Sequence, residues 1–170
     1  MKTINLIEHY NPITGAITGP VGALPIQTPV SPNGKSMVTA NTLTATITIV
    51  DPTTDTIVAM LPCDPGCHGV QYGAKQGGGY YAYVASKFSN SLIVVDPDRN
   101  NDGNPADAMI AGRILLKATG TTATDASITG NRGMEGPGIL TIPVVYNGWV
   151  QNLPQVWKDQ LTAAQRNPIQ

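Results

Sequence analysis

The chain has 170 residues, a formal net charge of −1 and only 12% charged residues, against about 25% in an ordinary globular protein. This low, balanced charge excludes the basic surface with which proteins bind nucleic acids or anionic membranes. No apolar run reaches the roughly 18–20 residues of a membrane-spanning helix, so we expect no membrane span. The many glycines and prolines are typical of an all-β protein with short strands and tight turns.

One short phrase, a β-rich run that ends in an Asx-Pro turn, occurs three times. Its Asx residues are Asn11, Asp51 and Asp96, each followed by proline, and they are spaced by 40 and 45 residues. A repeat of roughly 40–50 residues built from short strands is typical of a β-propeller blade. Because one blade cannot bury both of its faces alone, the sequence predicts a stack of such units.

The repeat holds residue by residue when the chain is shifted by 45 positions. Val38–Asn41 then aligns with Tyr83–Ser86, and Ile47–Pro52 aligns with Leu92–Pro97, with a polar hairpin between the two segments in each copy. Each copy reads as an approach strand, a turn, two strands joined by the hairpin, the Asx-Pro turn and an outer strand. Four antiparallel strands are what a propeller blade requires. The predicted fold class is therefore all-β, built from four-stranded antiparallel β-propeller blades.

Five segments resemble the YVTN family of β-propeller repeats. They are His68-Gly69-Val70, Ser31-Pro32-Asn33-Gly34-Lys35, Tyr83-Val84-Ala85-Ser86, Ser89–Asp96 and Asp51–Thr56. The resemblance covers roughly residues 4–118 and implies YVTN-like propeller blades over residues 1–118. It does not imply one activity, because such repeats occur in binding proteins, scaffolds and enzymes alike.

The number of units predicts an incomplete ring. Two complete units span roughly residues 25–66 and 67–118, and a part-blade precedes them, in which residues 4–10 turn into residues 16–18. A closed propeller needs at least four blades, and an open stack leaves strand edges and apolar faces unpaired. We therefore expect that the chain is part of a larger propeller, or that a protein partner or a second copy completes the ring.

Cys63 and Cys67 lie in the loop that leads into the second complete unit, and His68 follows directly. Four alternatives stay open for them. The first is a Cys63–Cys67 disulfide that closes a tight turn in an oxidising compartment, and the second is a pair of unpaired thiols. The third is covalent haem c, although the usual Cys-x-x-Cys-His motif has one residue fewer between its cysteines. The fourth is a transition-metal site that uses Cys63, Cys67 and His68, with Asp64 as a further ligand.

His68 has two interpretations of its own. A histidine in a loop near the propeller axis can bind a ligand or a metal ion, or it can hydrogen-bond backbone in the neighbouring blade and fix the turn. The place of His68 in the repeat pattern favours the structural role.

An acidic loop follows the third Asx-Pro turn, in residues 96–107. Its Asp-x-Asn-x-Asp-Gly pattern reproduces the first half of a calcium-binding loop, in which alternate oxygens face one side and the glycine allows a sharp turn. Met109 stands where the bidentate glutamate is expected, so a later aspartate would have to replace it. The alternative is a solvated Asn/Asp/Gly turn. The candidate calcium ligands are Asp98, Asn100, Asp102 and Asp107.

Beyond residue 118 the repeat pattern fades. Residues 119–138 are predicted as a polar connection rich in glycine and threonine, and residues 139–170 are predicted to hold further blade strands and a short C-terminal α-helix. The prediction places Asn152 at the N-cap of this helix and Pro154 in its first turn. Its apolar stripe comprises Trp157, Leu161 and Ala164.

The sequence contains no Gly-x-Ser-x-Gly or His-Glu-x-x-His motif, and its only histidines are His9 and His68. We expect no catalytic activity of the chain's own. The predicted function is a periplasmic or extracellular propeller module that presents loops such as 62–69 and 96–107 to a protein partner. The alternative is the propeller part of a metal- or c-haem-dependent oxidoreductase or electron-transfer protein. Residues 1–8 lack the apolar core of a secretion signal, which would lie upstream in a longer protein.

Overall fold

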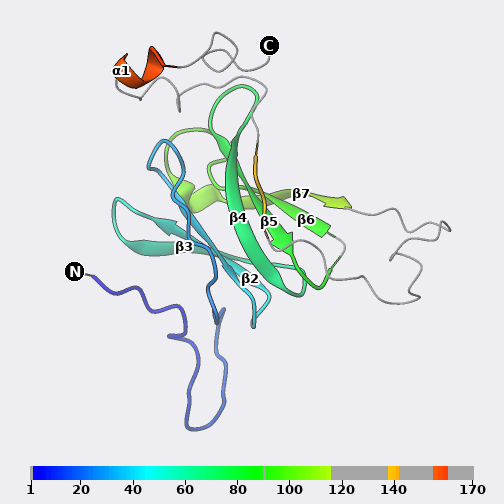
Figure 1. Cartoon of the computed structure of the whole chain (residues 1–170). Helices are drawn as coiled ribbons and strands as arrows, with labels where there is room; N and C mark the ends of the chain where they lie inside the picture. Colours follow the sequence, from blue (N-terminus) through cyan, green and yellow to red (C-terminus); the bar gives the residue numbers. More distant parts are fainter. Residues whose placement is uncertain (1, 90, 116–137, 142–154, 161–170) are drawn as a thin grey trace, which may run out of the picture. The chain divides into compact units, whose positions relative to one another are not determined.

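The computed structural model describes residues 2–89, 91–115, 138–141 and 155–160. It confirms an all-β chain, because the strands form two antiparallel sheets, one of three strands and one of four (Figure 1). By its internal packing the chain divides into Met1–Leu140, which contains both sheets, and Thr141–Gln170. Among the described residues, no helix is long and apolar enough to cross a membrane.

The first sheet has the order β1-β2-β3. Its strands are β1 (Met37–Asn41), β2 (Thr46–Asp51) and β3 (Thr56–Pro62). Residues 25–30 run along the free edge of β1, to which the isolated antiparallel bridges Pro25–Asn41 and Val30–Met37 connect them. They do not form a strand, so the first sheet has three strands where the repeat predicted four.

The second sheet has the order β4-β5-β6-β7. Its strands are β4 (Cys67–Ala74), β5 (Tyr80–Ser86), β6 (Ser91–Asp96) and β7 (Met109–Leu115). Residues 97–108 connect β6 to β7 and contain the short 3-10 helix η1 (Pro105–Asp107), whereas residues 52–55 alone connect β2 to β3. The acidic loop is thus an insertion into the second hairpin of this unit.

The internal repeat is also present in the pairing of the strands. β6 occupies the positions 45 residues after β2, and the β1–β2 and β5–β6 hairpins close in the same register. Both sheets carry a register irregularity at the same place, between Ile49 and Val50 of β2 and between Val94 and Val95 of β6. Because bulges are specific local features of a sheet, their match indicates that the two sheets are copies of one unit.

Asn11, Asp51 and Asp96, the three repeated Asx residues, form the same local turn. Each side-chain oxygen accepts a hydrogen bond from the backbone N–H two residues further on, in Ile13 (2.9 Å), Thr53 (2.7 Å) and Asp98 (3.4 Å). At Asp51 the Thr53 hydroxyl also donates (2.6 Å). The hydrogen bonds from Thr53 hold the pKa of the Asp51 carboxyl below its ordinary value.

Each sheet has two different faces, which we name the leading face and the trailing face. The leading face of the first sheet consists of Val38, Ala40, Ile47 and Ile49. The trailing face of the second sheet consists of Ala82, Val84, Ile93 and Val95. These side chains are fully buried, and they form one hydrophobic core between the two sheets together with Cys67, Val70 and Tyr72.

The core joins a leading face to a trailing face, so residues that are equivalent in the repeat do not meet. The 45-residue shift maps the leading face of the first sheet onto the leading face of the second, which is turned away from the core. That second leading face consists of Tyr83, Ala85, Leu92 and Val94. Contact between different faces is a head-to-tail relation, which further units can continue.

The predicted N-terminal part-blade is wrong in its strands. Residues 2–22 form turns, with a single bridge between Tyr10 and Ile17. Asn5 and Asn11 explain the difference, because their side-chain oxygens accept the N–H groups of residues two positions further on and so compete with strand pairing. This segment lies on the trailing side of the first sheet, where Gly22 packs against the Asn41 amide.

Little of the predicted C-terminal region belongs to the described residues. The connection 119–138 lies outside them except for Gly138, and residues 139–141 are in no strand. One helical turn, α1 (Gln155–Lys158), is described where the C-terminal helix was predicted. The rest of that helix and most of its apolar stripe lie outside the described residues, so an amphipathic C-terminal helix is not seen.

Candidate functional site

The loops of the two sheets gather at opposite ends of the strands. The β1–β2 hairpin, the β3–β4 loop and the β5–β6 hairpin lie at one end, which we call the hairpin end. The β2–β3 turn, the β4–β5 turn and the long β6–β7 loop lie at the other end, which we call the insertion end. The cysteines belong to the hairpin end and the acidic loop belongs to the insertion end, so the two predicted sites are separate.

A Cys63–Cys67 disulfide closes the β3–β4 loop, which confirms the first of the sequence alternatives. The loop is also fixed to the β1–β2 hairpin. The Thr42 hydroxyl donates to the Cys67 carbonyl (2.5 Å), and the Cys63 N–H donates to the Ala45 carbonyl (2.8 Å). The disulfide loop therefore connects the two repeat units at a defined position on the first hairpin.

The same loop packs against the β5–β6 hairpin of the second unit. The Lys87 N–H donates to the Gly66 carbonyl (2.8 Å), and the Ser89 hydroxyl donates to the Pro65 carbonyl (3.0 Å). Gly66 has a φ of +86°, and a Cβ added there would lie 2.6 Å from the Phe88 nitrogen. Only glycine fits this turn, because the backbone is left-handed and the hairpin approaches it closely.

Asp64, the proposed additional metal ligand, has other partners. Its Oδ2 accepts a hydrogen bond from the Ser91 hydroxyl (2.5 Å) and lies 3.2 Å from the Arg113 Nε. These contacts join the disulfide loop to β6 and β7. The carboxylate is thus used to fix the loop in place.

His68 is half-buried at the start of β4, and its side chain makes no hydrogen bond or ion pair with the described residues. The hydrogen bond to neighbouring backbone that the sequence suggested for it is therefore not formed there. Both sulfur atoms beside it belong to the disulfide. Haem attachment or metal binding by Cys63, Cys67 and His68 would require the reduced pair, and it stays a prediction that an absorption spectrum and metal analysis of the purified protein would test.

Two exposed apolar side chains mark the hairpin end. Leu43 is 74% exposed at the tip of the β1–β2 hairpin, and Phe88 is 51% exposed in the β5–β6 hairpin. They are equivalent under the 45-residue shift, and they flank the disulfide loop that contacts both hairpins. The sequence interpretation missed them because both hairpins were treated as polar. The sequence does contain a signal for these two residues, because an apolar side chain occurs at the same hairpin position in both copies of the repeat.

The predicted calcium ligands are brought together in one loop at the insertion end, but their oxygens accept hydrogen bonds from that loop. Asp98 accepts the N–H groups of Asp102 (3.0 Å) and Gly103 (2.9 Å). Asp107 accepts the N–H groups of Arg99 (3.1 Å) and Asn100 (3.2 Å).

Within the described residues, no three acidic, histidine or cysteine side chains are grouped to hold a metal ion. In the described loop, the Asx side chains stabilise the turn through these internal hydrogen bonds. Calcium binding stays a prediction, and calorimetric titration of the chain and of an Asp102→Ala variant would test it.

Lys75 attaches the inserted loop to the second sheet. Its ammonium group lies 2.9 Å from Asp96 Oδ2, and both side chains are about nine-tenths buried. The same group also donates to the carbonyls of Asp98 (3.1 Å) and Arg99 (3.4 Å). A buried charge needs partners of this kind, and here they hold the beginning of the β6–β7 loop.

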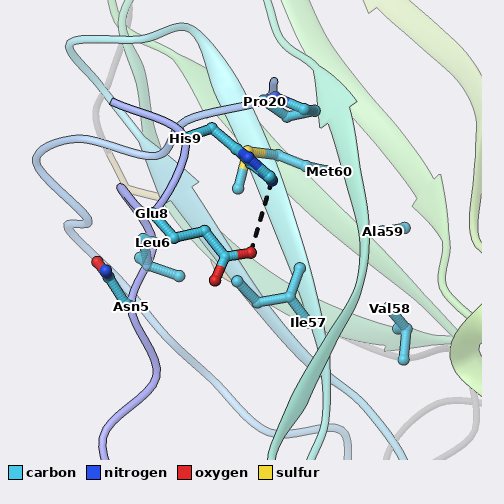
Figure 2. A pocket seen from close by; sticks show the side chains of 9 residues that line it. All are labelled: Asn5, Leu6, Glu8, His9, Pro20, Ile57, Val58, Ala59 and Met60. Atoms are coloured by element: carbon cyan, nitrogen blue, oxygen red, sulfur yellow. Dashed lines mark ion pairs between the residues drawn. The ribbon is translucent and has the colours of Figure 1, made fainter. Parts of the chain in front are cut away.

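A pocket of about 260 Å³ separates residues 5–20 from β3. Figure 2 shows the Glu8 and His9 side chains directed toward each other on the N-terminal side, with Ile57 and Met60 on the strand side. The Glu8 Oε1 and His9 Nε2 atoms are 3.5 Å apart, and both side chains are largely exposed. The pocket therefore reflects loose packing of the N-terminal segment more than a built site.

No protein-family model matches the chain, and a search of curated proteins finds no match. The resemblance to YVTN repeats therefore stays a prediction. What can be assigned from geometry is a hairpin end with two exposed apolar tips beside a disulfide, and an insertion end with a self-bonded acidic loop.

Proposed function

We propose that this chain is a propeller-type repeat module that acts outside the cytoplasm and binds a protein partner through its hairpin end. In this proposal the blades resemble YVTN repeats and belong to a larger ring. The module has no catalytic role of its own and works by holding its loops rigidly for the partner.

The head-to-tail relation of the two sheets supports the propeller part of the proposal. In a sandwich of two related sheets, the same face of each sheet can be buried against the other. In a propeller, each blade packs its leading face on the trailing face of the next blade. The leading face of the first sheet packs on the trailing face of the second. This is the relation that blades require.

One observation carries the binding part, namely the paired exposure of Leu43 and Phe88. Large apolar side chains at hairpin tips gain nothing for the fold when they stay in water, and exposed apolar groups beside polar ones are typical of protein-binding surfaces. The disulfide loop between the two hairpins restricts their movement. A rigid surface loses less conformational entropy on binding than a flexible one.

The disulfide also supports a location outside the cytoplasm. Disulfides persist in the periplasm and in extracellular space and are rare in the reducing cytosol. Calcium bound at the insertion end would fit the same location, and it would stiffen the long hairpin without taking part in binding at the opposite end.

Site-specific photocrosslinking in the source cells tests this proposal. A photoreactive phenylalanine analogue replaces Phe88 in one variant, Leu43 in a second and Ile13, which is 92% exposed in the N-terminal segment, in the control. We expect the same crosslinked protein partner from positions 43 and 88 and none from position 13. Equal crosslinking from all three positions, or none from 43 and 88, would contradict a binding surface at the hairpin end.

A further inference from the structure

The leading face of the second sheet is an apolar surface whose counterpart in the first sheet is fully covered. Its members are Tyr83, Leu92 and Val94, which are part-exposed, and Ala85, which is 1% exposed. The equivalent residues Val38, Ala40, Ile47 and Ile49 have no exposed area, because the trailing face of the second sheet packs on them. The chain thus contains one complete junction of this type and one more leading face.

The second leading face is open beside its central strand. Gly112 of β7 is paired with Val94, and a Cβ added at Gly112 would meet nothing within 4 Å. Ala59, which is paired with Ile49 at the equivalent place in the first sheet, packs against the core. Ile114, paired with Leu92, is 46% exposed.

The trailing face of the first sheet is the other end of the stack, and it is unusually polar. Asn41, Thr39 and Thr48 are fully buried there. The Asn41 Nδ2 donates to Thr48 Oγ1 (2.8 Å), but the Asn41 Oδ1 and the Thr39 Oγ1 have no hydrogen-bond partner. A polar atom that is buried without a hydrogen-bond partner lowers the stability of the fold, so these two atoms are destabilising.

Residues 19–24 of the N-terminal segment cover this trailing face, since Gly22 packs against the Asn41 amide, whereas the earlier part of the segment is loosely packed. Most residues between 2 and 18 are exposed, and the pocket lined by Leu6, Ile57 and Met60 lies beneath the segment. It leaves the two unpaired polar atoms as they are. Moving this segment aside breaks its hydrogen bonds to the first hairpin, such as that from the Thr46 hydroxyl to the Val21 carbonyl (2.9 Å), so a new contact has to replace them.

The two ends of the stack are chemically complementary. Tyr81 and Tyr83 lie on the leading side of the second sheet, with their rings in a T-shaped contact at 6.4 Å. A tyrosine hydroxyl is a hydrogen-bond donor of the kind that the Asn41 Oδ1 lacks. The aliphatic residues beside the tyrosines supply the apolar contact that every junction of this stack uses.

We propose that a second copy of this chain docks its first sheet, by the trailing face, onto the leading face of the second sheet, with residues 2–24, which cover the trailing face in the single chain, moved aside. If each copy makes this contact with the other, the two copies form a closed ring of four sheets. Four is the smallest number of blades in a propeller. The inference rests on the propeller architecture of the proposed function and adds the partner and the surface.

Light scattering after gel filtration of the full-length chain tests this docking. The wild type is compared with Gly112→Arg, which places a long charged side chain in the open space of the leading face without a clash in the single chain. Gln76→Arg, at an exposed residue of the β4–β5 turn, is the matched control. Far-UV circular dichroism of both variants verifies the fold, and Val94→Lys is a second disruption of the same face.

We expect twice the 17.8 kDa mass of one chain for the wild type and for Gln76→Arg, and the mass of one chain for Gly112→Arg and Val94→Lys. The two disruptive variants should weaken association at least about 10-fold, as loss of a central interface contact does. A monomeric wild type, an assembly of more than two copies, or a dimer that survives Gly112→Arg would overturn the proposal. None of these outcomes changes the crosslinks expected at position 88. The mass measurement therefore tests only the docking of two copies, and the crosslinking tests the proposed function.

Discussion

Tyr72 places a phenol hydroxyl inside the core between the two sheets. The hydroxyl donates to the Ser36 carbonyl (3.2 Å) and lies 3.0 Å from the Ser36 Oγ, so it joins β4 to the residue that precedes β1. Burial raises the pKa of Tyr72 well above its ordinary value near 10.0. The hydrogen bond thus fixes the two repeat units relative to each other through a group that stays neutral.

Replacing Tyr72 by phenylalanine should lower the free energy of unfolding by about 1–3 kcal/mol, because the buried Ser36 hydroxyl loses this partner, whereas the Ser36 carbonyl still accepts the Ser31 N–H. Urea denaturation measures this loss. Tyr10→Phe is the control, since the Tyr10 side chain is 41% exposed and its hydroxyl makes no hydrogen bond with the described residues. An equal effect of both substitutions would contradict a specific role for Tyr72.

The raised pKa of Tyr72 also predicts a pH dependence. Above the ordinary pKa of 10.0 the unfolded tyrosine releases its proton while the folded one keeps it, so the folded state binds more protons and stability falls as pH rises. We expect a slope of up to about 1.4 kcal/mol per pH unit above pH 10 that is present in the wild type and missing in Tyr72→Phe. Parallel pH profiles for the two proteins would contradict the assignment.

Lys75 is the second residue whose burial makes a clear prediction. Lys75→Met leaves the Asp96 carboxylate buried without its counter-charge, which typically costs about 3–5 kcal/mol. The double variant Lys75→Met/Asp96→Asn should recover much of this loss, because no charge then stays unpaired. Lys35→Met, at an exposed lysine, should be near neutral in the same thermal or urea denaturation. A double variant less stable than Lys75→Met would contradict this account.

At the scale of the elements, the β3–β4 loop is where the two units are joined. It contacts the β1–β2 hairpin through Thr42 and the β5–β6 hairpin through Gly66, and its disulfide restricts the path between them. The close approach at Gly66 lets both hairpins contact one short loop. The Leu43 and Phe88 tips are therefore held by the same element.

A pair of glycine substitutions separates close approach from backbone strain. Gly34 and Gly66 both have positive φ, at +72° and +86°, but a Cβ at Gly34 meets nothing within 4 Å. Gly34→Ala should cost about 1–2 kcal/mol for the left-handed conformation alone. Gly66→Ala should cost clearly more, because its Cβ also meets the Phe88 backbone. Equal losses of unfolding free energy would show that the loop moves freely away from the hairpin.

At the scale of the whole molecule, the sequence predicted the features that repeat. The three Asx-Pro phrases share the same side-chain-to-backbone hydrogen bond, and the 45-residue shift matched β2 to β6, because local hydrogen bonds and strand alternation depend on nearby residues. The prediction of a part-blade at residues 4–10 was wrong because a strand needs a partner strand, and the sequence of these residues does not show whether one is available. The order of the faces in the core depends on tertiary packing, and no single segment contains that information.

The leading-on-trailing contact of the two sheets is the central claim, and methyl–methyl NOEs in Ile/Leu/Val-labelled protein test it most directly. We predict NOEs from Ile47 and Ile49 of the first sheet to Val84, Ile93 and Val95 of the second. NOEs between the repeat-equivalent pairs would instead mean that equivalent faces meet as in a closed sandwich. Contacts of Ile47 with Leu92 and of Ile49 with Val94 would therefore contradict the stack of repeats and the propeller proposed from it.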